Sequence, residues 1–157
     1  MRTKLLSLTI CAGALLSAQQ CLADGYAYAT NGVRDNFAGR QGVIWKFLLD
    51  ESNLGGKELE MAEATFPAGM TTGDHAHSSV EIIYVLSGVY DHEVNGKLYR
   101  LKPGMVGIVR PGDKVRHLVP KEGDAKVLIL WAPAGEAARL LSTAKGTTPP
   151  PVPEVNK

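Results

Sequence analysis

The sequence predicts an all-β, single-domain fold of the sandwich or barrel type, followed by one short helix. Three observations lead to this prediction. Short runs of β-forming residues recur along most of the chain, glycines and prolines cluster between these runs, and only one segment has the composition of a helix. A chain of 157 residues, of which 45% are hydrophobic and 21% charged, is long enough for one globular domain.

The predicted strands begin after residue 40. Between residues 58 and 66, apolar and acidic residues alternate with the period of two that is typical of a half-buried strand. Asn95-Gly96 lies between two β-like runs and predicts a two-residue hairpin turn. The predicted strands are Val43–Leu49, Leu59–Phe66, Ile82–Leu86, Tyr90–Val94, Leu98–Leu101, Met105–Val109 and Val127–Trp131.

Four segments divide the chain. Residues 1–23 are predicted to be a signal peptide, and residues 24–40 form a polar, Gly-rich N-terminal arm. Residues 41–134 form the β-domain, and residues 135–157 comprise the helix, Gly135 to Ala144, and a Pro-rich tail. We therefore expect one folded unit with an extension at each end.

The leader has the three parts of a secretory signal. Arg2 and Lys4 precede an apolar run of 14 residues, and Cys21-Leu22-Ala23 provides a cleavage site. Two alternatives are a membrane anchor, for which the run is short of the roughly 20 residues needed, and lipidation at Cys21. Cleavage predicts a secreted or periplasmic protein that has no contact with the membrane after the leader is removed.

Charge excludes a nucleic-acid partner. The formal net charge of the whole chain is +1, and a binder of phosphate backbones needs a basic patch. Removing the leader takes two of the 17 basic residues and leaves 15 against 16 acidic ones. Both cysteines leave with the leader, so a metal bound by the mature chain must use nitrogen and oxygen ligands. We expect a small-molecule ligand or substrate.

The chemistry-bearing residues are three histidines and one glutamate. On a strand, His75 and His77 would point to one face, and Glu81 and His117 could approach the same point. Three imidazoles and a carboxylate suit one divalent transition metal, which could be Mn, Fe, Ni, Cu or Zn. The ordinary alternatives are a surface or core histidine pair and a loop histidine at position 117.

These residues carry a resemblance to the cupin superfamily, in particular to its small single-domain (cupin type-2) members. Gly69, His75, His77, Glu81 and Gly88 match the first cupin motif at every spacing. The resemblance extends over residues 57–133. It implies a jelly-roll β-barrel with the metal inside, bound by the residues at positions 75, 77, 81 and 117.

The second cupin motif is looser. Gly104, Pro111 and His117 occur in the expected order, but the stretch is about two residues longer than is usual in the family, and Lys121 stands where the family often has Asn. Cupins commonly dimerise through their N-terminal strands, so the resemblance also implies a homodimer with an interface in residues 24–49.

Two residues are candidates for catalysis. Glu81 is expected to be a metal ligand, with the role of an unligated general base as the alternative. His92 shares a strand face with Tyr90 and Val94, so it is either a proton shuttle near the metal or a rim histidine bonded to a backbone carbonyl.

The alternation of side chains along a strand also predicts which face three neighbouring residues take. Tyr84 is expected to pack on the outer layer, whereas Asp91 and Glu93 are expected to face solvent. Arg110 and Arg116 flank His117 and would either hold an anionic substrate or be solvated.

Two functions fit this site. The resemblance implies a metal-dependent dioxygenase acting on a small enolic or phenolic substrate, with isomerases and decarboxylases as other enzymes of the family. In that interpretation Ile83, Val85 and Val94 would form the wall that excludes water. The alternative is a non-catalytic secreted cupin that binds a metal or a small ligand.

Overall fold

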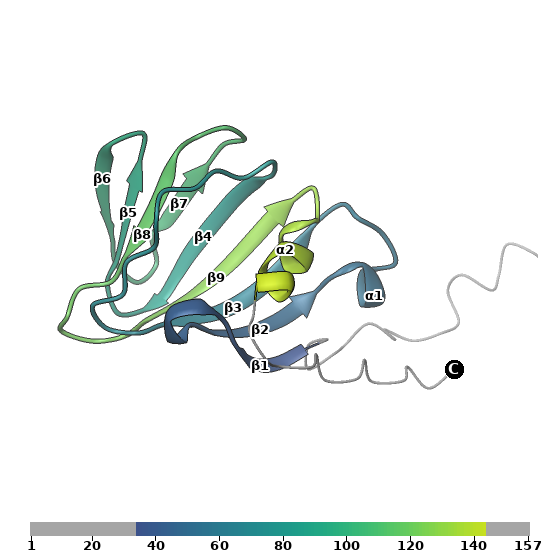
Figure 1. The fold of residues 1–157 in the computed structure, drawn as a ribbon, viewed down its shortest axis with the longest axis horizontal. Coiled ribbons are helices and arrows are strands. Elements are labelled where there is room, and N and C mark those ends of the chain that lie inside the picture. Colours follow the sequence, from purple (N-terminus) through teal and green to yellow (C-terminus); the bar gives the residue numbers. More distant parts are fainter. Residues whose placement is uncertain (1–33, 144–157) are drawn as a thin grey trace, which may run out of the picture.

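The computed structural model describes residues 34–143, which form two antiparallel sheets (Figure 1). A six-stranded sheet has the order β1-β2-β3-β9-β4-β7, and a three-stranded sheet has the order β6-β5-β8. The predicted leader, most of the arm and the Pro-rich tail lie outside the described residues. The strands are β1 (Arg34–Ala38), β2 (Ile44–Leu49), β3 (Glu60–Phe66), β4 (Val80–Ser87), β5 (Tyr90–Val94), β6 (Lys97–Leu101), β7 (Val106–Val109), β8 (Val115–Leu118) and β9 (Ala125–Ala132).

Alternating burial along the central strands builds the core. Every second residue of β3 and β9 is buried, because successive side chains of a strand point to opposite faces of the sheet. Trp45, Phe66 and Trp131 meet in this interior, with ring centroids 5.8 Å apart for Trp45–Phe66 and 6.0 Å for Trp45–Trp131. The predicted all-β jelly-roll architecture is confirmed.

The predicted hairpin is present between β5 and β6. Val94 pairs with Lys97, and the two turn residues Asn95 and Gly96 have φ values of 51° and 79°. Both turn positions of this hairpin type need positive φ, which Asn and Gly tolerate best. The turn fixes the register that carries His92 into the three-stranded sheet.

The predicted C-terminal helix is confirmed as α2 (Glu136–Thr143). Its Leu140 and Leu141 pack against the core. No helix among residues 34–143 is long and apolar enough to cross a bilayer.

The strand β1 and the short helix α1 (Glu51–Leu54) are among the elements that were not predicted. The last residues of the expected arm form β1, which pairs with β2, and tertiary pairing of this kind leaves little trace in a polar sequence. The short helix α1 follows β2. Asp50 accepts a hydrogen bond from the Ser52 backbone while Asn53 caps the Asp50 N–H, so a capping box stabilises this single turn.

The long connection between β3 and β4 carries two of the expected ligands. The prediction that His75 and His77 lie on a strand is wrong, because the structure has only isolated bridges here, Thr71 to Leu118 and His75 to Val115. The connection is nevertheless hydrogen-bonded to β8 and lies along that edge of the three-stranded sheet. This tie brings residues 75 and 77 to His117.

Candidate metal centre

Backbone hydrogen bonds fix the connection that holds the first two histidines. His75 exchanges both backbone hydrogen bonds with Val115, at 3.0 and 2.8 Å, and the Gly112 N–H donates to the His77 carbonyl at 3.2 Å. Thr72 contacts His117 twice, because its N–H donates to the His117 carbonyl and its hydroxyl accepts from the His117 N–H. The connection and β8 therefore present their histidines as one unit.

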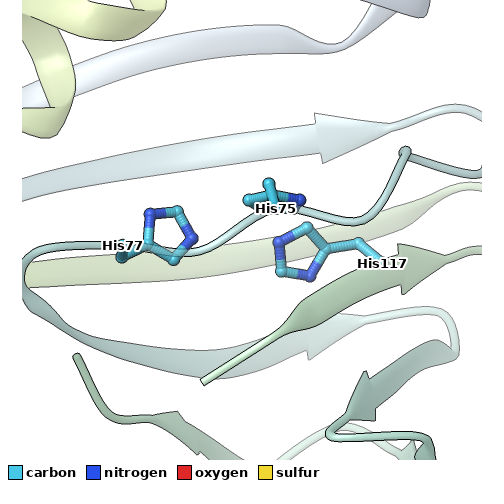
Figure 2. Close-up of side chains that lie close together, drawn as sticks. All are labelled: His75, His77 and His117. Atoms are coloured by element: carbon cyan, nitrogen blue, oxygen red, sulfur yellow. The ribbon is translucent and has the colours of Figure 1, made fainter. Parts of the chain in front are cut away.

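The three imidazoles form one group. His75, His77 and His117 each offer a ring nitrogen, and these three atoms all lie within 4.8 Å of one another. Figure 2 shows the rings of His75 and His77 on the connection, with the ring of His117 beside them on its strand. Ring centroids are 5.0 Å apart for His75–His77 and 4.9 Å for His75–His117. His77 and His117 are buried, whereas His75 is partly exposed.

Glu81 lies at the start of β4 and joins the group from the other side. Its Oε1 accepts a hydrogen bond from the Trp131 indole at 3.0 Å and lies 3.4 Å from His77 Nε2. Its Oε2 lies 3.9 Å from the Nε2 atoms of both His92 and His117. Three of the four predicted ligands, the histidines, therefore form one group, and the fourth, Glu81, lies within 4 Å of two of them, His77 and His117.

His92 lies beside two of the expected metal ligands, His117 and Glu81. It pairs with His117 across β5 and β8, its ring lies 5.1 Å from that of His117, and it is 1% exposed. Glu81, His92 and His117 form a second group of possible ligands within 4.8 Å of one another. A place at the rim does not fit, because His92 is buried, and its Nε2 has no hydrogen-bond partner among residues 34–143.

Space for the His92 ring comes from Gly107 on β7. A Cβ at that position would lie 2.7 Å from His92 Nδ1 and 2.7 Å from a Leu101 methyl carbon. Any side chain at position 107 would therefore push His92 or Leu101 aside. This inward position agrees with the predicted strand parity of residues 90, 92 and 94.

Burial and neighbouring charges shift the titration of the site. Burial lowers the pKa of His117 well below its usual value, and burial together with the charges of His75 and His77 lowers the pKa of His92 to about 4. Burial also lowers the pKa of His75 and raises that of Glu81. For His77, burial opposes protonation but is outweighed by the carboxylates of Glu136 and Glu81, so its pKa is raised.

The buried polar atoms of the site fit a cation. In the described part of the chain, both ring nitrogens of His77, Glu81 Oε2, His92 Nε2 and His117 Nδ1 are buried without a hydrogen-bond partner. Unpartnered buried polar atoms are costly, and such atoms on four neighbouring side chains are the arrangement expected of a metal site. His75 fits as well, since its Nδ1 lies 2.9 Å from the Gly73 carbonyl, which leaves Nε2 free for a metal.

A cavity of about 300 Å³ opens onto these side chains. Its lining combines polar side chains with aromatic and aliphatic ones, among them Trp45, Phe66, Ile129 and Trp131. The predicted wall of Ile83, Val85 and Val94 is wrong, because none of these residues lines the cavity. Ile83 and Val85 are buried in the core behind it.

The positions of several polar side chains near the site also differ from those predicted. Arg40 and Arg139 line the cavity, whereas Arg110 and Arg116 do not. Arg116 instead pairs with Glu93. Asp91, expected on the solvent face, is 7% exposed and receives two hydrogen bonds from Arg100, which explains how its charge is tolerated. Tyr84 is 40% exposed on the outside of β4, as expected for an outward-facing residue.

Two site residues were missed from the sequence. Trp131 orients Glu81, and Glu136 of α2 places Oε1 3.2 Å from His77 Nδ1. Glu136 is the only acidic residue of the predicted helix, which is the one signal the sequence offered. Its position depends on how the helix docks and not on any local spacing.

Comparisons with known proteins agree with this fold. Residues 62–133 match the family described as "Cupin domain". No curated protein sequence matches the chain. KdgF from a Halomonas species is a similar solved structure, with a TM-score of 0.59 and 22% identity over 66% of this chain and 90% of that one.

Two further solved structures are similar. An RmlC-like cupin from Shewanella frigidimarina has a TM-score of 0.57 and 21% identity over 69% of this chain and 89% of its own. A predicted oxalate decarboxylase from Thermotoga maritima has a TM-score of 0.57 and 23% identity, covering 66% and 95%. Identities this low show the fold alone. The chain therefore has the cupin fold, with histidine and glutamate side chains that could hold a metal inside it.

Proposed function

We propose that the chain is a metal-binding cupin whose ion is held by His75, His77, Glu81 and His117. The observation that supports this most strongly is that the three histidines bring ring nitrogens within 4.8 Å of one another, while His77, Glu81 and His117 carry buried polar atoms without a hydrogen-bond partner among residues 34–143. Nitrogen and carboxylate ligands of this kind suit Mn, Fe, Ni, Cu or Zn. A bound divalent ion would supply Lewis acidity and open positions for the oxygens of a substrate.

We further propose that the site is catalytic and acts as a dioxygenase on a small enolic or phenolic substrate. The cavity of about 300 Å³ is at the small end of the range for ligand pockets, and its aromatic wall suits a flat, partly apolar molecule. Arg40 and Arg139 at the cavity would attract the anionic form of an enol or a phenol.

Proton transfer would fall to Glu81 and His92. Burial raises the pKa of Glu81, so its carboxylate accepts a proton more readily than an exposed glutamate does. His92 Nε2 lies 3.9 Å from Glu81 Oε2 on the side of Glu81 away from the cavity, since Glu81 lines the cavity and His92 does not. This role belongs to the alternative in which Glu81 is not a ligand: an unligated Glu81 would exchange a proton with the substrate, and His92 would relay that proton inward.

Export and association complete the proposal. We propose that residues 1–23 direct the chain to a secreted or periplasmic location and that the mature chain is a homodimer. The presence of β1 at the edge of the six-stranded sheet supports an interface that involves the N-terminal region, because an edge strand has unpaired backbone groups.

Oxygen consumption tests the catalytic part. The protein would be loaded separately with Fe²⁺, Ni²⁺, Cu²⁺ and Mn²⁺, and oxygen uptake would be followed with catechol-type and enol-type substrates, with products identified by mass spectrometry. Uptake that depends on both metal and substrate, and is lost in Glu81→Gln, is expected. A protein that binds metal stoichiometrically but consumes no oxygen, and converts none of these substrates, would be a non-catalytic binding protein.

A further inference from the structure

The first residue of α2 contacts the expected metal site from outside. Glu136 is 4% exposed, its Oε1 lies 3.2 Å from His77 Nδ1, and its Oε2 accepts a hydrogen bond from Arg139 Nε. Glu136 is not one of the four expected ligands and lies beyond residues 62–133, which match the cupin family. A buried carboxylate at this place therefore needs its own explanation.

The contact selects which nitrogen of His77 can bind a metal. Both ring nitrogens of His77 face a carboxylate, Nδ1 that of Glu136 at 3.2 Å and Nε2 that of Glu81 at 3.4 Å. Glu81 Oε1 already accepts the Trp131 indole N–H and is the more distant of the two, so the hydrogen of a neutral His77 is assigned to Nδ1. Nε2 then keeps its lone pair, and it lies 3.4 Å from Glu81 Oε1. The 3.2 Å contact does not meet the geometry of a full hydrogen bond, so the attraction between the Nδ1–H dipole of His77 and the Glu136 carboxylate is mainly electrostatic. Both side chains are nearly buried, which strengthens that attraction.

Docking of the helix does not by itself explain Glu136. Three other contacts hold the helix and the segment before it. Glu60 Oε2 accepts from the Ala137 N–H at 2.8 Å, the Ser79 hydroxyl donates to the Pro133 carbonyl at 2.6 Å, and Leu140 and Leu141 pack against the core. An i,i+3 pair between Glu136 and Arg139 needs no burial and contributes little to stability at a surface.

We propose that Glu136 is a positioning residue for His77 and that α2 is therefore part of the metal site. The inference rests on the proposed metal site at His77 and deepens it. Carboxylates that hold the second nitrogen of a ligating histidine fix its tautomer and ring orientation and raise its basicity. A domain cut at residue 134 would keep all four expected ligands but lose this control.

Zinc binding tests the proposal in the full chain. Affinity for Zn²⁺ would be measured by competition with a chromophoric chelator for the wild type, Glu136→Ala, Glu136→Gln and Glu51→Gln. Loss of such a carboxylate weakens metal binding by about 10- to 100-fold, so Glu136→Ala is expected in that range and Glu136→Gln near about tenfold, because the amide oxygen still accepts. Glu51 is exposed, and its one ion pair among residues 34–143 is with Lys57, so its substitution is expected to change affinity by less than about twofold.

Nitrogen-15 spectra of the metal-free proteins give a second readout. At mildly alkaline pH, His77 of the wild type is expected to show hydrogen on Nδ1, and Glu136→Ala is expected to shift its population toward the other tautomer. A merely structural role would lower the melting temperature and leave this tautomer unchanged.

Two results would overturn the inference. The first is an unchanged His77 tautomer in Glu136→Ala, and the second is Zn²⁺ binding by Glu136→Ala that equals that of the wild type. If the wild type binds no Zn²⁺, the proposed function fails, and the tautomer spectra still decide whether Glu136 sets the His77 ring.

Discussion

Replacing Trp131 by Phe tests how Glu81 is held. The substitution keeps an aromatic ring in a site that is 1% exposed but removes the indole N–H that donates to Glu81 Oε1 at 3.0 Å. A hydrogen bond to a charged group contributes about 1.5–3 kcal/mol, and its loss leaves the carboxylate oxygen unpartnered in the interior. The smaller ring also leaves a void that costs about 1–2 kcal/mol. We expect the free energy of unfolding to fall by about 3–4 kcal/mol.

Trp45→Phe is the matched control. Trp45 is also buried and lies 6.0 Å from Trp131 in the same aromatic cluster, but its indole donates no hydrogen bond to a carboxylate within residues 34–143. Its substitution is expected to cost only the void, about 1–2 kcal/mol. Both variants would be unfolded in urea without metal and followed by far-UV circular dichroism. Equal losses in the two variants would refute the account of Trp131, because the hydrogen bond would then contribute nothing.

Four more substitutions, the last of them a control, test individual contacts in the structure. His92→Ala is expected to keep the bound metal and to lose most of the oxygen-consuming turnover. Loss of the metal instead would place the ion in the second group of possible ligands, Glu81, His92 and His117. Gly107→Ala is expected to lower the free energy of unfolding by about 1–3 kcal/mol and to alter the absorption spectrum of the Co²⁺-loaded protein, because its Cβ would press on His92. An unchanged spectrum would argue against this contact. Gly88→Ala is expected to lower the free energy of unfolding by more than about 3 kcal/mol, because its Cβ would lie 2.1 Å from the Asp124 carbonyl oxygen at a φ of +76°. Gly69→Ala is the control, since its Cβ would meet only a Lys121 side-chain carbon, at 3.4 Å. Similar melting temperatures for the two variants would contradict the steric argument.

The strands and the hairpin were predictable because their signals are local. The alternation in residues 58–66 and the Asn95-Gly96 turn depend on residues close together in the chain, and both were confirmed. The strand β1 was not predictable, because its pairing with β2 is a tertiary contact. The capping residues Asp50 and Asn53 of α1 were visible in the sequence, but a helix of four residues has too few apolar positions to show a period.

The sequence predicted which residues belong to the candidate site better than it predicted how they are arranged in space. The spacing of His75, His77 and Glu81 named residues that the structure brings close together, but it placed the two histidines on a strand. The inward position of His92 followed from parity, whereas its distance from Glu81 depends on how two sheets face each other. Glu136 was missed for the same reason, because the docking of α2 joins residues 59 positions apart in sequence, His77 and Glu136.

Bound metal is the most direct test of the central claim. The protein would be purified without chelator or a metal-affinity step and its metals measured by mass spectrometry, beside the His75→Ala/His77→Ala double variant. We predict about one transition-metal ion per chain in the wild type and none in the double variant. No bound ion in the wild type, and none after Mn²⁺, Fe²⁺, Ni²⁺, Cu²⁺ and Zn²⁺ are supplied, would contradict the account.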